Sequence, residues 1–419
     1  MEKRKKKNLK LYPKYRQLSM DFLFYYTINV LFLTQIKNID MSSVVLVDTF
    51  YALFVILWQI PAAVLVGKLG RKKVMILGNV CNVLYLLLVM NSTNLISLIC
   101  AEMMSALAFT LKDIAEPSML NCSINSTTQE KSNIFAKIQG KAVSGYYRLS
   151  AISMILAGFL FEINGYIPIS LSLCIVIIAL ILSTRFEEID EPLEDDDEKY
   201  VTIKDAIKFV LQSQRCRCLL LFSGIFYATI TVLATYEISL LEEMQISSKY
   251  LGIIFACLNI ISSIASKKQH IFQEKFKNRT LTVLGISLTL SCIIAAAATY
   301  LKVNMYIILA IILVMYIIKY SMVGLYNVLV IKYLSNFTNH KIDSKIFAVN
   351  SFNSSVLSVI FGLLGAGLLK IMPIQNAMLI YGTISFVIII IVLAHMRERV
   401  GLEPSQYSKL ELKYDKVRK

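Results

Sequence analysis

The chain has 419 residues, of which 56% are hydrophobic and 17% are charged, and its formal net charge is +15. A soluble protein has about 45–50% apolar and about 25% charged residues. The composition therefore excludes an ordinary soluble domain and indicates a membrane protein. The excess of basic residues follows the expected loops, so it indicates membrane topology and not binding of nucleic acid.

Twelve long apolar stretches account for the hydrophobic excess. Each is close to the about 20 residues that a helix needs to cross a bilayer. Their expected bounds are 18–36, 43–66, 74–90, 95–119, 140–162, 166–184, 217–241, 250–267, 281–301, 304–332, 346–369 and 375–396. The sequence therefore predicts an all-α polytopic membrane protein with twelve transmembrane helices.

The Lys and Arg residues are distributed unevenly between the two sides of these spans. With the amino terminus inside, the outer loops hold Lys37, Lys249, Lys302 and Lys370, and the spans hold Lys112, Arg148 and Lys319. The others of the 43 Lys and Arg fall at the inner face, eight of them in the segment 1–17. This bias predicts a multi-pass protein of the cytoplasmic membrane with both termini in the cytoplasm.

A change in composition separates the sixth and seventh spans. Residues 187–198 hold nine acids in twelve positions, which is typical of a solvated linker. In 201–211 the apolar residues recur on one helical face, which predicts a helix lying on the inner leaflet. The expected parts of the chain are a basic cytoplasmic arm 1–17, a six-helix bundle 18–185, an acidic linker 186–214, a second six-helix bundle 215–396 and a cytoplasmic tail 397–419.

The loop 67–73 reads Gly-Lys-Leu-Gly-Arg-Lys-Lys between two spans. Such a short turn needs a glycine, and three successive cations hold it at the cytoplasmic face. The loop resembles the Gly-x-Leu-Ala-Asp-Arg-x-Gly-Arg-Lys motif of the major facilitator superfamily. The matching positions are Leu65, Lys68, Gly70, Arg71 and Lys72, whereas Gly67 stands at the acidic position and Ala63 at the first glycine.

This resemblance implies the fold of that superfamily, which is two six-helix bundles around a central cavity lined by helices 1, 4, 7 and 10. It also implies that Gly70, Arg71 and Lys72 form a gating loop. The cations of this loop are explained equally well if they only hold it at the cytoplasmic face and so fix the membrane topology. The family's acid joins in an inter-helix charge lock, and its replacement by Gly67 leaves that part of the gate unaccounted for.

The fourth span carries the largest number of charges inside the membrane, and such charges are functional candidates because they are costly there. At about 100° per residue, Glu102, Asp113 and Glu116 share one helical face. Lys112 and Glu116 are four residues apart, and we expect them to pair. Pro117 is expected to end the regular helix.

Arg148 of the fifth span lies about 4–5 Å inside the midplane and Asp113 about 9 Å, counted from the helix middles. The sequence therefore predicts an ion pair between them. A pair that only joins the two helices and a pair with a transport role are equally compatible with this placement.

Polar residues also recur at helical spacing in spans 1, 7 and 10. The first span carries Asp21, Tyr25 and Asn29. The seventh carries Tyr227 and Thr231 in a stripe that hydroxyl bonds to the helix's own backbone also explain. The tenth carries Tyr316, Lys319, Tyr320 and Asn327, and we expect no acid at the depth of Lys319 in its half, because Glu237 lies about 12 Å further out.

From these patterns, the substrate-binding candidates are Tyr25, Asn29, Arg148, Tyr227, Thr231, Tyr316, Lys319, Tyr320 and Asn327. The candidates for proton coupling are Asp21, Glu102, Asp113 and Glu116. The eight cysteines and three histidines are scattered, so neither a metal site nor a disulfide is expected.

The sequence lacks a nucleotide-binding Gly-x-x-x-x-Gly-Lys-Ser/Thr motif and any catalytic cluster, so neither an enzyme nor a cofactor is expected. The hypothesis is a monomeric secondary transporter of a small molecule that works by alternating access with a proton gradient. A multidrug-type efflux antiporter, and a non-transporting transceptor or lipid-handling protein of the same fold, are the alternatives.

Overall fold

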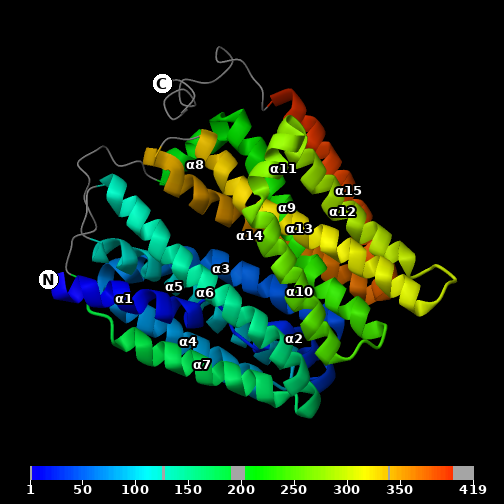
Figure 1. Ribbon diagram of the computed structural model, residues 1–419, viewed down its shortest axis with the longest axis horizontal. Coiled ribbons are helices and arrows are strands. Elements are labelled where there is room, and N and C mark those ends of the chain that lie inside the picture. The colour runs from blue at the N-terminus through cyan, green and yellow to red at the C-terminus, as the bar shows by residue number, and fades with distance from the viewer. Residues whose placement is uncertain (1, 125–127, 190–202, 338–339, 400–419) are drawn as a thin grey trace. The chain divides into compact units, whose positions relative to one another are not determined.

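The computed structural model describes residues 2–124, 128–189, 203–337 and 340–399 (Figure 1), and these residues form helices and no strand. The chain separates into two compact units. The first comprises Met1–Asp195 with Leu241–Cys257, and the second comprises Asp196–Leu240 with Leu258–Lys419. The division of the chain into an arm, two bundles, a linker and a tail stays a prediction.

The first unit contains eight helical segments before the division. They are α1 (Glu2–Ser19), α2 (Tyr25–Leu31), the π-helix η1 (Phe32–Ile36), α3 (Met41–Leu69), α4 (Arg71–Asn91), α5 (Leu95–Ser123), α6 (Thr128–Ile163) and α7 (Tyr166–Thr184). Helices α1, α4 and α7 lie side by side in Figure 1, and α4 also packs along α5.

The remaining helices follow the acidic linker. They are α8 (Ile203–Gln212), α9 (Gln214–Glu243), α10 (Ser248–Lys267), α11 (Gln269–Phe276), the 3₁₀ helix η2 (Lys277–Arg279), α12 (Thr280–Ala298), α13 (Met305–Phe337), α14 (His340–Ile371) and α15 (Ile374–Arg399). The predicted amphipathic segment is helical as α8. Most of the acidic run 187–198 and of the tail 397–419 lies outside the described residues.

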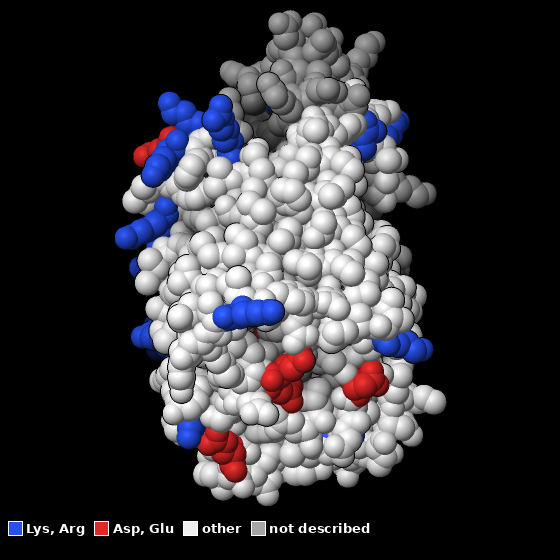
Figure 2. Space-filling model, turned by 90° about the vertical axis from the view of Figure 1, so that its right-hand side faces the viewer, with Lys and Arg blue, Asp and Glu red and all other residues white. Residues whose placement is uncertain are grey.

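Eleven helices in the described part of the chain are long and apolar enough to cross a membrane. They correspond to the second to twelfth expected spans. Figure 2 shows one face of the molecule on which uncharged residues predominate and charged side chains are few and scattered.

The first expected span differs from the prediction because it is not one helix. The chain leaves α1 after Ser19 and becomes helical again at Tyr25, and Phe24 has a φ of 68°. Residues of a right-handed α-helix have a negative φ, so a positive φ at a residue other than glycine interrupts the helix. The hydropathy of 18–36 could not show this break, because the residues that form it, 20–24, are apolar apart from Asp21.

Helix α1 packs within the first unit, against α5, α6 and α7. Apart from Pro13, its buried residues recur every three or four positions, at Lys5, Asn8, Tyr12, Tyr15 and Ser19. This spacing is that of one helical face. The tyrosines join a core cluster that also contains Met75, Leu111, Met119 and Phe186. The segment expected to be a basic arm is therefore a helix with a buried inner face.

The prediction that Pro117 ends a helix is wrong, since α5 continues to Ser123. Proline inside a membrane helix is tolerated because neighbouring groups satisfy the freed backbone carbonyl. The start of α5 is fixed by a capping box in which the Asn94 side chain accepts from the Ser97 N–H. Helix α3 begins in a related way, with Asp40 accepting from Ser43 N.

Candidate functional site

The break in the first span is held by side chains from two other helices. The hydroxyl of Ser172 in α7 accepts from the Tyr25 N–H at 2.9 Å and donates to the carbonyl of Leu23. The ammonium of Lys112 in α5 donates to the carbonyl of Ser19 at 2.5 Å. Backbone groups freed by the break are thus satisfied, as the interior of a membrane protein requires.

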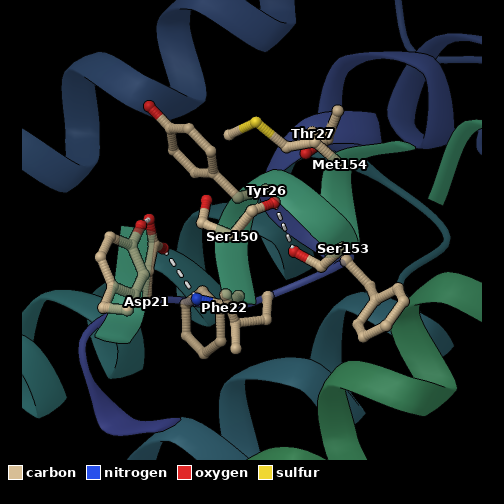
Figure 3. Close-up of a pocket in the computed structure, with 10 residues that line it drawn as sticks. Asp21, Phe22, Tyr26, Thr27, Ser150, Ser153 and Met154 are labelled. Carbon is tan, nitrogen blue, oxygen red and sulfur yellow. Dashed lines mark hydrogen bonds between the residues drawn. The ribbon is translucent and has the colours of Figure 1, made fainter. Parts of the chain in front are cut away.

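Asp21 lies in this break, beside a small cleft (Figure 3). Its carboxylate accepts from the Phe22 N–H at 2.7 Å and from the Tyr146 hydroxyl at 3.0 Å. Ser150 and Ser153 of α6 line the same cleft. The space in it that the centre of a water-sized molecule can reach is about 10 Å³, so the cleft is far smaller than the pockets that bind drug-sized ligands. The cleft alone suits water or a small ion.

Glu116 of α5 is fully buried and is bound by three side chains of α1. Its Oε1 accepts from the Tyr15 hydroxyl at 2.7 Å and the Ser19 hydroxyl at 3.2 Å, and its Oε2 forms an ion pair with Arg16. The cation paired with Glu116 is thus Arg16, and the possible pairing with Lys112 is not among its ion pairs. Lys112 instead contacts Ser19 and lies over a phenyl ring of its own helix, with Nζ 4.4 Å from the centroid of Phe109.

The predicted ion pair between Asp113 and Arg148 is also wrong. Asp113 lies 3.6 Å from the Arg16 guanidinium, and its own side chain is 66% exposed. Arg148 is exposed and its Nε donates to the Ser144 carbonyl one turn earlier in α6. Depth alone suggested the pair, but the two side chains do not face each other, and α1 supplies a nearer cation.

Glu102 occupies a separate place near the other end of α5. It accepts from the Tyr85 hydroxyl of α4 at 3.0 Å, and the carboxylate of Asp48 interacts with it electrostatically. The ring of Tyr25 lies 6.3 Å from that of Tyr85. The three carboxylates expected on one face of the fourth span are therefore divided between the Arg16 cluster and this aromatic cluster.

The second unit contains a buried ion pair between α9 and α13. Lys319 Nζ lies 2.8 Å from Glu237 Oε2, and the two side chains are only 3% and 2% exposed. The expectation that Lys319 has no acid within reach is therefore wrong. That expectation compared the heights of the Cα atoms, whereas the long stem of a lysine carries its charge well away from its own backbone.

Aromatic residues surround this pair. The Tyr320 ring lies 4.8 Å from Lys319 Nζ, a cation–π contact. The hydroxyl of Tyr316 is buried and has no hydrogen-bond partner in the described part of the chain. A buried hydroxyl without a partner is unfavourable, so this group is a candidate to bind water or substrate.

Two further sequence candidates make hydrogen bonds within their own helices. Asn29 accepts from the backbone N–H of Val30 at 2.7 Å, and Thr231 donates to the Ala228 carbonyl of its own helix at 2.9 Å. Tyr227 is 44% exposed, and Asn327 is exposed as well. Their substrate-binding roles remain predictions.

The loop between α3 and α4 turns at Gly70, which has a φ of 83°. Arg71 is buried, and its Nε donates to the Ser118 hydroxyl of α5 at 2.8 Å. The backbone N–H groups of Arg71 and Lys72 donate to the carboxylate of Glu188, at 3.1 and 2.7 Å. This acid follows α7 and was not a sequence candidate.

Four further residues of these clusters were missed by the sequence prediction, namely Tyr15, Arg16, Tyr85 and Glu237. The spacing of Asn8, Tyr12, Tyr15 and Ser19 was a usable signal for a buried face in α1. Among the described residues, no group of three His, Cys, Asp or Glu side chains is placed to hold a metal ion. The eight cysteines are free thiols.

Solved transporter structures are similar to this chain. The nucleoside transporter NupG has a TM-score of 0.71 at 12% identity, with 93% of this chain and 99% of that one covered. A bacterial homologue of the human lysosomal transporter Spinster has a TM-score of 0.69 at 14% identity, with 98% of each chain covered. A D-xylose–proton symporter has a TM-score of 0.70 at 10% identity, with 91% and 96% covered.

At such low identities the likeness shows the fold alone, and no curated protein matches the chain in sequence. The sequence profile described as Major Facilitator Superfamily matches residues 18–352, which is most of the chain. Together with the membrane-spanning helices and the shared fold, this match shows that the chain belongs to the Major Facilitator Superfamily.

Proposed function

We propose that the protein moves a small molecule across the cytoplasmic membrane by alternating access, driven by a proton gradient. The observation that carries this proposal is the set of carboxylates within apolar helices, at Glu102, Glu116 and Glu237. Charge in the bilayer interior is costly and is found mainly at substrate and proton pathways. Carboxylates are also the side chains that most simply exchange a coupling proton.

The three acids have different surroundings, and these suggest different roles. Glu116 is paired with Arg16 and accepts hydrogen bonds from two hydroxyls, so all its contacts are to groups of α1. Glu102 contacts a neutral tyrosine hydroxyl and an acidic neighbour, Asp48. A carboxyl without a cation beside it takes up a proton more readily. Glu102 is therefore our candidate for the coupling proton, ahead of Glu116, Asp113 and Asp21.

Lys319 remains our candidate for the substrate contact in the second unit. Glu237 neutralises it within the unit, so a substrate with an anionic or strongly hydrogen-bonding group would have to compete with that carboxylate. The partnerless hydroxyl of Tyr316 offers a second donor on the same helix. Two similar solved structures are named as a nucleoside transporter and a D-xylose–proton symporter. Nucleosides and D-xylose are small polar molecules, and the polar candidate residues on α2, α9 and α13 suit a substrate of that class.

The test is transport by purified protein in proteoliposomes, screened against nucleosides, sugars, amino acids and antibiotics with a pH gradient imposed. Glu102→Gln should retain exchange between equal substrate pools and lose accumulation driven by the gradient. The matched control is Glu162→Gln, an acid paired with Lys249 at 3.8 Å whose side chain is 36% exposed; it should transport normally. Full gradient-driven accumulation by Glu102→Gln would exclude this residue as the proton carrier.

The same screen separates the alternatives. Export of amphiphilic drugs without accumulation of metabolites would identify a multidrug-type antiporter. Failure to move any compound, with folded protein, would favour a transceptor or lipid-handling role.

The proposed topology has both termini in the cytoplasm. Cysteines introduced at Lys249 and Lys302 should react with an impermeant maleimide added outside cells. A cysteine at Asp196, which lies outside the described residues, should react only after the membrane is opened. External labelling at Asp196 would contradict this orientation.

A further inference from the structure

The residues Phe186–Ile189 follow Arg185, the residue that caps the end of α7, and we call these four residues the strap. Phe186 is fully buried and its ring lies 5.3 Å from the ring of Tyr15 in α1. Ile189 is also buried, with 3% exposed. The strap is therefore anchored by an apolar residue at each end, although it begins the most acidic stretch of the chain.

Glu188 of the strap lies at the start of α4. Its two carboxylate oxygens accept from two successive backbone N–H groups, those of Arg71 and Lys72, at 3.1 and 2.7 Å. The first N–H groups of a helix have no partner within the helix, and a negative charge there is favourable. The residue that precedes α4 is Gly70, which has no side chain to cap it. Glu188 supplies the missing cap from 116–117 positions away in the sequence.

The contact fits the glycine at position 70 closely. A Cβ on Gly70 would lie 3.2 Å from the Glu188 carboxylate, so the carboxylate fills the space that a side chain would need. Arg71 makes a further link, because its Nη1 donates to the Ile189 carbonyl at 3.2 Å while its Nε reaches Ser118 of α5. The strap, the loop and α5 thus meet around one arginine.

The strap also binds α1. The Asn8 side chain pairs with the backbone of Glu187 in both directions, accepting from its N–H at 3.0 Å and donating to its carbonyl at 2.9 Å. Lys7 adds an exposed ion pair at 2.5 Å, and this hydrogen bond lowers the pKa of the Glu187 carboxyl. The backbone bonds to Asn8 do not depend on the Glu187 side chain.

From these contacts we infer that Glu188 is the positioning residue of the loop between α3 and α4. In the motif that this loop resembles, the position of Gly67 is acidic. Here a carboxylate from a different part of the chain, Glu188, contacts the loop instead. This inference rests on the proposed function insofar as the loop has a role in transport. The capping itself is independent of that function and can be measured without a substrate.

The experiment is hydrogen–deuterium exchange on the full-length protein in nanodiscs, comparing Glu188→Ala with Glu187→Ala. These neighbours carry the same charge, but only the Glu188 side chain reaches α4. We expect the amides of residues 71–74 to exchange about five-fold faster in Glu188→Ala, the effect of losing a typical helix cap. Glu187→Ala should leave these amides unchanged, and Glu188→Asp should restore part of the protection.

Unchanged exchange at 71–74 in Glu188→Ala, or an equal increase in Glu187→Ala, would overturn the inference. Transport gives a second measurement once the screen has identified a substrate. A positioning role predicts a lower maximal rate with unchanged substrate affinity in Glu188→Ala, whereas general destabilisation would lower the amount of folded protein. If the screen finds no substrate, the proposed function fails while the exchange result still decides the role of Glu188.

Discussion

Lys319 and Glu237 form an ion pair of 2.8 Å in which both side chains are almost completely removed from solvent. The pair joins α13 to α9 within the second unit. Two opposite charges buried together tolerate each other, but either one left alone would be costly. The buried charge on each of the two helices is therefore tolerated only while the other helix supplies its partner.

Single neutralisation of this pair should destabilise the protein more than double neutralisation. Lys319→Met or Glu237→Gln alone should each cost about 3–5 kcal/mol, because an unpaired charge stays buried. The double variant Lys319→Met/Glu237→Gln should recover much of that loss. Chemical or thermal unfolding in detergent, analysed as a double-mutant cycle, gives the coupling energy. Additive effects of the two single changes would show that the pair is not coupled.

The exposed pair between Lys249 and Glu162 is the control for that cycle. It lies at 3.8 Å with side chains 37% and 36% exposed. Solvent screens such pairs, so its neutralisation should change stability little.

Glu116 and Asp113 share the Arg16 guanidinium but differ in burial, and their substitutions should differ accordingly. Glu116→Gln leaves Arg16 with only an exposed partner, and it should lower the melting temperature clearly, by an amount equivalent to several kcal/mol. Asp113→Asn removes an exposed carboxylate at 3.6 Å and should have little effect. Arg148→Gln should behave like Asp113→Asn. A larger loss from Asp113→Asn than from Glu116→Gln would contradict the structure.

Ser172 is expected to be essential for the break in the first span. Ser172→Ala leaves the Tyr25 N–H and the Leu23 carbonyl without their partner, which should cost about 1–3 kcal/mol per buried group. Ser170→Ala is the matched control, because that hydroxyl only donates to the Tyr166 carbonyl of its own helix. Unfolding curves of the two variants measure the difference. Equal stability would show that the break does not need the α7 hydroxyl.

Two glycines three residues apart should respond oppositely to alanine. Gly70→Ala places a Cβ at a φ of 83° and 3.2 Å from Glu188, at an expected cost of about 1–3 kcal/mol. Gly67 lies within α3 with nothing within 4 Å of a new Cβ, so Gly67→Ala should be neutral or stabilising by up to about 1 kcal/mol. Thermal unfolding of both variants checks this. A stable Gly70→Ala would mean that the turn can change its backbone conformation freely.

The fold was predictable because apolar stretches of the right length identify membrane helices with little regard to packing. The spans from α3 to α15 follow directly from hydropathy. The break at Phe24 was not predictable, since it depends on Ser172 and Lys112, which reach it from distant helices. The sequence could identify charged residues that are costly inside the membrane, such as Glu116 and Lys319, but not the residues with which they pair; whether they form the functional site stays a prediction.

The predicted ion pairs were wrong where they were inferred from the depth of two residues along their helices, without knowing in which direction the side chains point. Asp113 and Arg148 lie at suitable depths, yet neither side chain faces the other, and Arg16 had been assigned to topology alone. Glu237 was set aside for the height of its Cα, although the lysine and glutamate side chains both extend away from their own backbones and meet. Glu188 was hidden in an acidic run whose composition suggested only a linker.

The attachment of α1 has a consequence for biosynthesis. Asn8 binds Glu187, which is made 179 residues later, and Tyr15 binds Glu116, 101 residues later. Chains are synthesised at about 5–20 residues per second and their domains generally fold as units, the N-terminal one first. Helix α1 must therefore wait many seconds after its own synthesis, until the residues that follow α7 have been made, before its final partners exist. During that interval the polar and charged side chains of α1 lack the partners that they have in the folded protein, and groups outside this chain have to solvate them.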